Sequence, residues 1–274
     1  MLVSIITPSY RNSSWLKLCI ASVADQQVAI EHIIQDAASD DGTLDWLPQD
    51  RRVKVFVEQD QGMYDAINRG LRHATGDILG WLNCDEQYLP GALTAVERFF
   101  AQHPDVDVVF GDVVLVDPAG EYLCHRKVQA PLKYHTWTSH LSTLSCATFF
   151  RRKVVFDYGF FFDPRWRAAG DGEWMLRMLQ RGVTMSAMKM FTSVFTRTGT
   201  NLGLGPDARR ENQLLFETAP YWARKLKSFI VVHHRLRRLL HGSYSQKRFD
   251  YSLYTQQSPA TRVSRHVEHP SFRC

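Results

Sequence analysis

Short apolar runs alternate with segments of helical periodicity through the first 117 residues, and this alternation limits the folds that the chain can adopt. The runs predicted as strands are rich in Val and Ile and cover residues 2–10, 30–36, 52–58, 76–82 and 105–117. Between them, apolar residues recur three or four positions apart, as expected for helices. We therefore expect βαβ units, that is, an α/β fold with a mostly parallel sheet flanked by helices.

The first four predicted strands end in mostly polar residues. The residues at these ends are Thr7 and Pro8, Asp36, Glu58 and Asp60, and Asn83, Asp85 and Glu86. One such end would indicate only a turn, but ligands bind beyond the carboxyl ends of an open parallel sheet. Four neighbouring ends therefore favour a shared binding site. The turn after the first strand lacks G-x-G-x-x-G, which disfavours a dinucleotide site.

A second acidic pattern lies in the less regular half of the chain. Asp171 and Glu173 fall in the first turn of a predicted helix, where carboxylates stabilise the positive end of the helix dipole. This structural explanation competes with a functional one. Gly170 and Gly172 open backbone space around Asp171, which favours a functional site. Trp174, in the same helix, either stacks on a ligand or belongs to the core.

The composition is that of an ordinary globular protein, with 45% hydrophobic and 22% charged residues. No run of about 18 apolar residues exists, so no transmembrane helix is expected. The N-terminus lacks the basic segment of a signal peptide, and we interpret residues 2–7 as the first strand. Five scattered cysteines without a C-x-x-C pair indicate reduced thiols in a cytoplasmic protein.

The formal charge of +5 is concentrated near the C-terminus. Between Thr218 and Phe249 the chain has eight Lys or Arg and no Asp or Glu, whereas the remainder has 25 basic and 28 acidic residues. Apolar residues recur among these cations, which predicts a basic amphipathic helix over residues 222–241. Such a helix can bind an anionic membrane surface, or it can pack on the domain or a partner with its charges solvated. We expect no nucleic-acid binding, because no known module accompanies the helix.

Five ordered segments resemble the family 2 glycosyltransferases, in particular the bacterial enzymes that build surface polysaccharides. The segments are IIQDAASDDGT (33–43), EQDQGMYDAINRGLRHATGDILGWLNCDE (58–86), FGDVVLVDPAGE (110–121), TFFRRKVV (148–155) and AAGDGEWMLRM (168–178). Each is weakly specific alone, but their order and spacing make the resemblance specific. It implies a GT-A (Rossmann-like) fold and an inverting transfer from a nucleotide-diphosphate sugar.

The resemblance also implies roles for residues at the strand ends. Asp85 matches the aspartate that binds Mn²⁺ or Mg²⁺ in the family's DxD-type motif, and Glu86 stands where another acidic residue often follows. Asn83 replaces the first Asp of that motif, so it removes one negative charge but can still bond a ribose hydroxyl. The implied donor-nucleotide residues are Thr7, Pro8, Tyr10, Asp36, Asp60, Asp65, Asn68, Asn83 and Asp85. For Asn68, the cap of a neighbouring loop is an equal alternative.

An inverting transfer needs one general base for the acceptor hydroxyl. The resemblance assigns this role to Asp171, with Glu173 as the second candidate or as a residue that orients the acceptor. The usual acidic neighbour before the base is replaced by Gly170. The glycine-rich loop 197–211 is either a plain connection or a segment that closes over the donor. In the second case Arg197, Arg209 or Arg210 would bind the diphosphate.

We therefore expect a GT-A domain over residues 1–205, with a nucleotide-binding half (1–117) and an acceptor half (118–205), followed by a basic helical extension (206–274). The expected function is a metal-dependent inverting glycosyltransferase, acting in polysaccharide biosynthesis. It would move a sugar from a UDP-sugar to a hydroxyl of a glycan or lipid-linked acceptor, in the cytoplasm or on the inner face of the cytoplasmic membrane. The alternative is a non-catalytic nucleotide-sugar-binding relative that acts as a partner or regulator in a glycan assembly complex. A nucleotidyltransferase is disfavoured, because no Gly-rich loop with a Lys follows the first strand.

Overall fold

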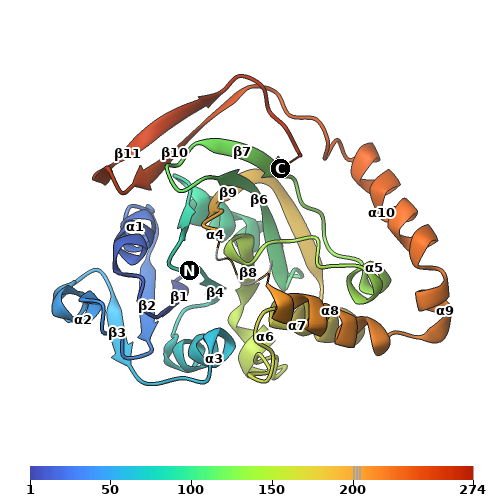
Figure 1. Cartoon of the computed structure of the whole chain (residues 1–274), viewed down its shortest axis with the longest axis horizontal. Coiled ribbons are helices and arrows are strands. Elements are labelled where there is room, and N and C mark those ends of the chain that lie inside the picture. Colours follow the sequence, from blue (N-terminus) through green and yellow to red (C-terminus); the bar gives the residue numbers. More distant parts are fainter. Residues whose placement is uncertain (200, 202, 204, 274) are drawn as a thin grey trace.

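The computed structural model describes residues 1–199, 201, 203 and 205–273, and in this part of the chain a nine-stranded sheet forms the centre of the molecule (Figure 1). The strands are β1 (Val3–Ser9), β2 (Ile30–Asp36), β3 (Lys54–Val57), β4 (Ile78–Trp81), β5 (Glu86–Tyr88), β6 (Val108–Val116), β7 (Tyr122–Arg126), β8 (Thr148–Arg151) and β9 (Met185–Thr196). In space they follow the order β3-β2-β1-β4-β8-β6-β9-β5, with β7 beside β6.

Helices connect and cover these strands. They are α1 (Ser13–Ala24), α2 (Thr43–Trp46), α3 (Met63–His73), α4 (Ala92–Gln102), α5 (Lys133–Thr138), α6 (Arg152–Phe156), α7 (Gly170–Arg181), α8 (Pro206–Glu217), α9 (Tyr221–Lys225) and α10 (Lys227–Leu240), with 3-10 turns η1 (Leu47–Gln49) and η2 (Ser145–Ala147). A hairpin of β10 (Phe249–Thr255) and β11 (Ser258–Val267) follows α10. Within the described part of the chain, no helix combines the length and hydropathy that crossing a bilayer requires.

The sheet is parallel in the half that carries the strand ends singled out above. Strands β3, β2, β1 and β4 run parallel, as the alternation predicts. Beyond β4 the sheet is mixed, because β8 is antiparallel to both β4 and β6 while β9 is parallel to β6. Ser9 of β1 pairs with Asp36 of β2, so these two strands end at one level. The carboxyl ends of the parallel strands therefore lie along one edge.

The core lies on both faces of the sheet, because successive side chains of a strand point to opposite sides. Ile5 belongs to the cluster that contains Cys19 of α1 and Phe100 of α4. Ile6 belongs to the cluster that contains Ile67 of α3 and Trp174 of α7. Trp174 is fully buried and its Nε1 donates to the Phe160 carbonyl (2.7 Å), which assigns it to the core.

The extension after residue 205 is helical only over its first part. Residues Phe249–Val267 form a hairpin instead, and the expectation of a helical extension is wrong there. The reason is tertiary: Tyr251, Leu253 and Val267 fit into a cluster with apolar side chains of the main sheet. In Figure 1 the hairpin lies above the sheet, close to α1. The domain boundary at residue 205 stays a prediction.

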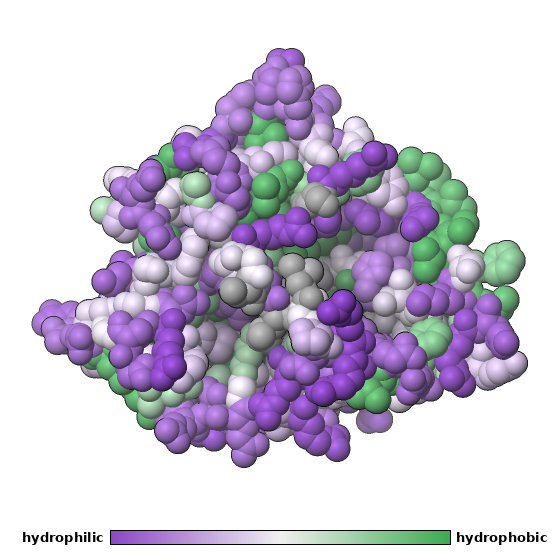
Figure 2. Space-filling model, in the orientation of Figure 1, coloured by the Kyte–Doolittle hydropathy of each residue, from purple (hydrophilic) through white to green (hydrophobic). Residues whose placement is uncertain are grey.

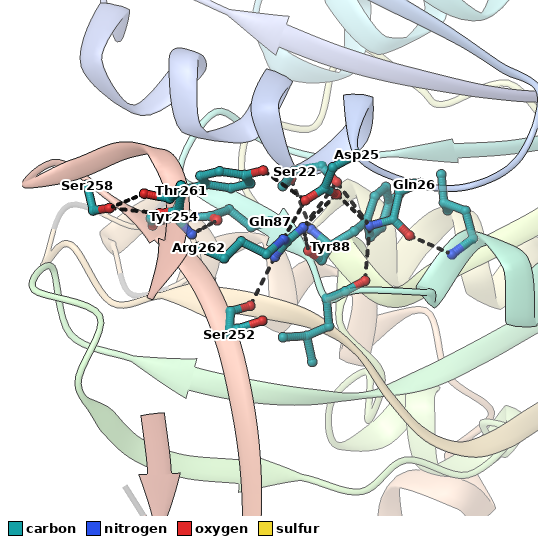
Figure 3. A network of polar contacts seen from close by, with 12 residues as sticks. Ser22, Asp25, Gln26, Gln87, Tyr88, Ser252, Tyr254, Ser258, Thr261 and Arg262 are labelled. Atoms are coloured by element: carbon teal, nitrogen blue, oxygen red, sulfur yellow. Dashed lines mark hydrogen bonds and ion pairs between the residues drawn. The ribbon is translucent and has the colours of Figure 1, made fainter. Parts of the chain in front are cut away.

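A polar network fastens this hairpin to α1 and β5 (Figure 3). The Arg262 guanidinium pairs with Asp25, at 2.5 and 2.9 Å, and the Tyr254 hydroxyl donates to the same carboxylate (2.8 Å). Gln87 exchanges two hydrogen bonds with the Tyr254 backbone, each 2.8 Å long. These groups are more than 160 positions apart in the chain, so no local pattern indicates their contact.

The cysteines follow the sequence-based expectation in part. Cys19, Cys84 and Cys146 are free and buried. Cys124 is disulfide-bonded, so the expectation of reduced thiols throughout is wrong. The error arises because spacing in a sequence does not show which cysteines a fold brings within bonding distance. Cys274 lies outside the described residues.

Candidate active site

A cavity of about 950 Å³ lies at the carboxyl edge of the parallel strands. Figure 2 shows the molecular surface hollowed near the centre of this face. Of the residues predicted from the sequence, the structure brings together at its wall Pro8, Tyr10, Asp60, Asn83, Asp85, Asp171 and Arg197. Asp85 follows β4 and Asp171 begins α7, so the cavity joins carboxylates from both halves of the chain.

The turn after β4 presents Asp85 to the cavity and hides Glu86. The backbone N–H of Glu86 donates to the backbone carbonyl of Asn83 (3.1 Å), and the backbone N–H of Asn83 donates to Glu86 Oε2 (2.8 Å). Glu86 is thereby turned into the protein, where burial and the neighbouring Asp85 charge raise its pKa to about 8. The predicted metal-ligand role of Glu86 has no support from this geometry, because its carboxylate faces the Asn83 amide and Ser145.

The described residues hold Asp85 only weakly. Among them, its carboxylate accepts one long hydrogen bond, from Asn201 Nδ2 at 3.3 Å. Burial raises the pKa of Asp85, because a desolvated carboxylate favours the neutral form. Two residues earlier, Asn83 Oδ1 is buried without a hydrogen-bond partner among the described residues. A carboxylate and an unsatisfied amide oxygen at a cavity wall are suited to a hard cation or to ligand hydroxyls.

Asp171 is fixed by its own helix and by α3. Its Oδ1 accepts from the Gly172 amide (2.8 Å), and the Tyr64 hydroxyl lies 3.5 Å from the same oxygen. The Asp171 amide donates to that hydroxyl (3.1 Å). Burial raises the pKa of Asp171. Glu173 is instead paired with Arg177 at 2.7 Å and does not line the cavity.

Gly170, which replaces an acidic residue of the family pattern, has a steric explanation. A Cβ atom built on Gly170 would come within 2.6 Å of Tyr64 Cε2 and within 2.9 Å of two further ring carbons. Real Cβ atoms essentially never approach this closely, so a larger residue would displace the Tyr64 ring. The glycine therefore permits the close contact between Tyr64 and the start of α7.

Glu211 of α8 anchors the segment before Asp171, a role that the sequence did not reveal. Its carboxylate accepts three backbone N–H groups in a row: Arg167 (2.7 Å), Ala168 (2.9 Å) and Ala169 (2.8 Å). Glu211 is only 4% exposed. A buried carboxylate with three amide donors is strongly oriented, and it ties α8 to the beginning of α7.

Three predicted donor-site residues have partners inside the protein and do not line the cavity. Asp36 accepts from Ser9 Oγ (2.8 Å) and from the amide and hydroxyl of Ser39 (2.7 and 2.9 Å). A hydrogen bond joins Thr7 Oγ1 to His32 Nε2 (2.9 Å). Asn68 makes two bonds to the backbone of the loop before α7, at 2.8 and 2.9 Å, as the loop-cap alternative predicts.

The remaining predicted residues lie on helix surfaces. Asp65 accepts from the Gln61 amide (3.0 Å) and pairs with Arg69 (3.1 Å). Arg209 and Arg210 are exposed on α8, and Arg210 pairs with an aspartate one turn earlier (3.0 Å). Neither arginine lines the cavity. Loop 197–211 includes residues 200, 202 and 204, which lie outside the described residues, so its closure over a ligand stays a prediction.

The structure adds residues that the sequence-based prediction lacks. Gln59, Tyr64, Arg126, Ser145 and Asn201 line the cavity. Tyr64 had a signal, since it lies inside the acidic segment between Asp60 and Asp65. Gln59 lies in the same segment and Asn201 lies in the glycine-rich loop, but nothing in the sequence singled out either side chain. Arg126 and Ser145 come from segments without a pattern of their own, and only the packing of distant elements brings them to the wall.

The architecture is that of the GT-A glycosyltransferases. S. aureus TarS (residues 1–349, in complex with UDP-GlcNAc) superposes with a TM-score of 0.63 at 17% identity, covering 88% of this chain and 73% of that 1–349 chain. The mannosyltransferase PcManGT from Pyrobaculum calidifontis, in complex with GDP-Man and Mn²⁺, gives a TM-score of 0.56 at 16% identity, with coverages of 87% and 78%. At these identities the likeness concerns the fold alone.

The model of glycosyl transferase family 2 matches residues 4–160, and the chain belongs to this family. The resemblance inferred from the sequence is thereby confirmed. A PGL/p-HBAD biosynthesis glycosyltransferase of Mycobacterium tuberculosis is 36% identical over 119 residues, which are 41% of this chain and 46% of the relative. The putative teichuronic acid biosynthesis glycosyltransferase TuaG of Bacillus subtilis is 38% identical over 93 residues, with shares of 32% and 37%. The match spans less than half the length of these relatives.

Proposed function

We propose that this chain is an inverting, metal-dependent glycosyltransferase that transfers a sugar from a UDP-sugar to a hydroxyl of a glycan or lipid-linked acceptor, in polysaccharide biosynthesis. The observation that carries the proposal is a single cavity lined by both Asp85, after β4, and Asp171, at the start of α7. A nucleotide-sugar donor is supported by the ligands of the structural neighbours, UDP-GlcNAc and GDP-Man.

The residues around Asp85 fit a divalent cation. No group of three or more His, Cys, Asp or Glu side chains in the described part of the chain could hold a metal. Mg²⁺ and similar ions, however, often use one or two carboxylates together with substrate phosphates. Asp85 would supply the carboxylate and Asn83 Oδ1 a second oxygen. When bound, Mn²⁺ or Mg²⁺ supplies positive charge that neutralises the diphosphate as the glycosidic bond breaks.

Asp171 acts as the general base in this proposal. Its Oδ1 is occupied by the Gly172 amide, whereas Oδ2 has no hydrogen-bond partner among the described residues and can accept the proton of an acceptor hydroxyl. Burial raises the pKa of Asp171, which makes the carboxylate a stronger base. The activated oxygen attacks the anomeric carbon from the face opposite the diphosphate, and this geometry inverts the configuration.

The nucleotide is assigned to the β1–β3 side of the cavity. Tyr10 is 54% exposed at the cavity wall, so its ring is available to stack on a base, and Pro8 lies beside it. Asp60 is the carboxylate of this side that can meet the nucleotide. Asp36 would act indirectly, because its hydrogen bonds to Ser9 and Ser39 set the shape of the β1 and β2 ends.

Release of nucleotide from a panel of UDP- and GDP-sugars, with and without Mn²⁺, tests the proposal on the purified full chain. We expect turnover of at least one donor, dependence on the ion, and a loss of about 10²- to 10⁴-fold in Asp171→Asn. Glu173→Gln separates the two candidate bases, because a larger loss in that variant would reverse their assignment. Tight nucleotide binding without turnover of any donor would instead establish the non-catalytic alternative.

We also propose that α9 and α10 bind an anionic membrane surface, which would place the cavity near a lipid-linked acceptor. In α10, all of whose residues the structure describes, only His234 is buried. The apolar face points outward: Phe229, Leu236 and Leu240 are 73%, 53% and 85% exposed. Figure 2 shows hydrophobic surface along the side where Figure 1 places α10. Interspersed Lys and Arg, without acidic residues, complement anionic lipid headgroups.

Flotation with liposomes that contain an anionic lipid tests this surface. We expect wild type to float, and the double substitution Phe229→Ser with Leu236→Ser to remain in solution. Leu214→Ser is a matched control, because Leu214 is 50% exposed on α8, outside this surface. Substitutions are preferable to removal of residues 222–274, since the hairpin in that segment packs on the main sheet. Flotation of the double variant would refute the proposal.

A further inference from the structure

Two arginines stand on the acceptor-half side of the cavity, over an apolar floor. Arg126 ends β7 and Arg197 directly follows β9. Both line the cavity, together with Leu115 and Phe195. Phe195 and Arg197 are two positions apart, and residues i and i+2 of an extended strand point to the same face. Arg126 pairs in register with Val113, which is likewise two positions from Leu115. The arginines thus share one face of the sheet with two side chains that cannot neutralise them.

The positive charge of these arginines has no acidic partner in the part of the chain that the structure describes. No carboxylate of the described residues forms an ion pair with Arg126 or Arg197. The hydrogen bonds of Arg126 all leave from Nη1, toward Cys124 Sγ, the His125 carbonyl and the Phe272 carbonyl. Its Nε and Nη2 therefore have no acceptor in the described part of the chain. A partly buried guanidinium that lacks a counter-ion is costly unless a ligand supplies the charge.

Electrostatic repulsion among the arginines of this region also favours a bound anion. Burial lowers the pKa of Arg126, and the nearby Arg238 and Arg197 lower it further. Three cations therefore lie close enough to repel one another around a half-buried group. A bound anion would relieve this repulsion, and the low polarity of the floor would strengthen its attraction to the guanidinium groups.

We propose that Arg126 and Arg197 form an anion subsite that binds a phosphate group of a substrate. The fork of a guanidinium matches phosphate oxygens in a bidentate manner, whereas Asp171, and Asp85 without a bound cation, repel anions elsewhere in the cavity. This inference rests on the proposed function, since it names the chemistry of a substrate of the same cavity. The phosphate has two possible sources: the diphosphate of the donor, or a phosphate carried by the acceptor.

Equilibrium binding to the full chain, measured by calorimetry, distinguishes these sources. The probes are UDP, uridine, and glycerol phosphate added to protein saturated with UDP. If the subsite binds the donor diphosphate, Arg126→Gln weakens the affinity for UDP by about 10- to 100-fold and leaves the affinity for uridine unchanged. If the subsite binds a phosphate of the acceptor, Arg126→Gln leaves the affinity for UDP unchanged and weakens the affinity for glycerol phosphate by a similar factor. Unchanged affinity for both phosphate probes in the folded variant overturns the inference.

Two further variants keep the test decisive. Arg165→Gln is the matched control, because the Arg165 side chain is 88% exposed and pairs only with Asp163 among the described residues. Should Arg126→Gln lower the melting temperature, Arg197→Gln replaces it, since the Arg197 side chain makes no hydrogen bond to the described residues and its loss does not threaten the fold. The binding measurements do not depend on catalytic turnover. If the wild-type protein binds UDP but transfers no sugar, the proposed enzymatic function is refuted, while the anion subsite can still be tested.

Discussion

Substitution of Glu211 with alanine removes the acceptor that three consecutive backbone amides share at the start of α7. The amides belong to Arg167, Ala168 and Ala169, and their distances to the Glu211 carboxylate lie between 2.7 and 2.9 Å. We expect two consequences from this single change. The protein loses stability, and Asp171, two residues beyond the last anchored amide, loses its fixed position.

The size of the stability loss follows from the burial of each amide. Ala169 is buried, so its N–H is left without an acceptor at a cost of about 1–3 kcal/mol. Arg167 is exposed and Ala168 is half-buried, so water can replace Glu211 at smaller cost. The expected total is about 2–4 kcal/mol, which lowers the melting temperature of a chain of this size by roughly 5–10 °C. A displacement of Asp171 by about 1 Å would reduce kcat about 100-fold.

Calorimetry and nucleotide release measure these two effects. Glu217→Ala on the same helix is the control, because Glu217 is exposed and, among the described residues, accepts only from Gln213 (2.8 Å). It should change neither quantity. A melting temperature of Glu211→Ala within about 2 °C of wild type, or an unchanged kcat, would refute the argument that Glu211 positions the start of α7.

Three further predictions follow from other contacts. Gly170→Ala forces the Tyr64 ring away from Asp171, so kcat should fall about tenfold while UDP affinity stays the same; steady-state kinetics with UDP calorimetry checks this, and a wild-type kcat would contradict it. Burial raises the pKa of Glu86 from 4.5 to about 8, so the stability that its protonated form contributes is fully present below pH 4.5 and is lost as the pH rises to about 8. Urea unfolding at pH 5, 7 and 9 should show that the free energy of unfolding of Glu86→Gln rises relative to that of wild type as the pH rises. A difference between the two proteins that stays the same at all three pH values would disprove the raised pKa of Glu86. Arg262→Ala breaks the pair with Asp25 and should cost about 2 kcal/mol and speed hydrogen exchange in β10 and β11; unchanged exchange there would exclude an anchoring role.

Much of the fold could be predicted because the relevant signals are local. Val and Ile runs, helical spacing and the polar strand ends sit within segments of about ten residues, and they lead to the parallel half of the sheet. The hairpin of β10 and β11 escaped prediction for the opposite reason. Its stability depends on Asp25 and Gln87, which are more than 160 residues away.

The location of the site could be predicted from the sequence, but which side chains line it could be predicted only in part. Asp85 and Glu86 are neighbours with the same chemistry, yet only Asp85 reaches the cavity. The difference arises because the backbone N–H of Asn83 donates a hydrogen bond to the Glu86 carboxylate, which holds that carboxylate inside the turn. Asp36 likewise lies at a predicted strand end, but two serines occupy its oxygens.

The sequence by itself determined the α/β architecture, the family, and the edge of the sheet where ligands bind. These properties follow from periodicity and from the rule that parallel strands end at a common edge. Only the tertiary structure decided which carboxylates face the cavity, that Glu211 anchors the start of α7, and that Arg126 stands beside Arg197. Such outcomes depend on the competition of each polar group for hydrogen-bond partners from distant segments, and spacing along the chain carries no record of that competition.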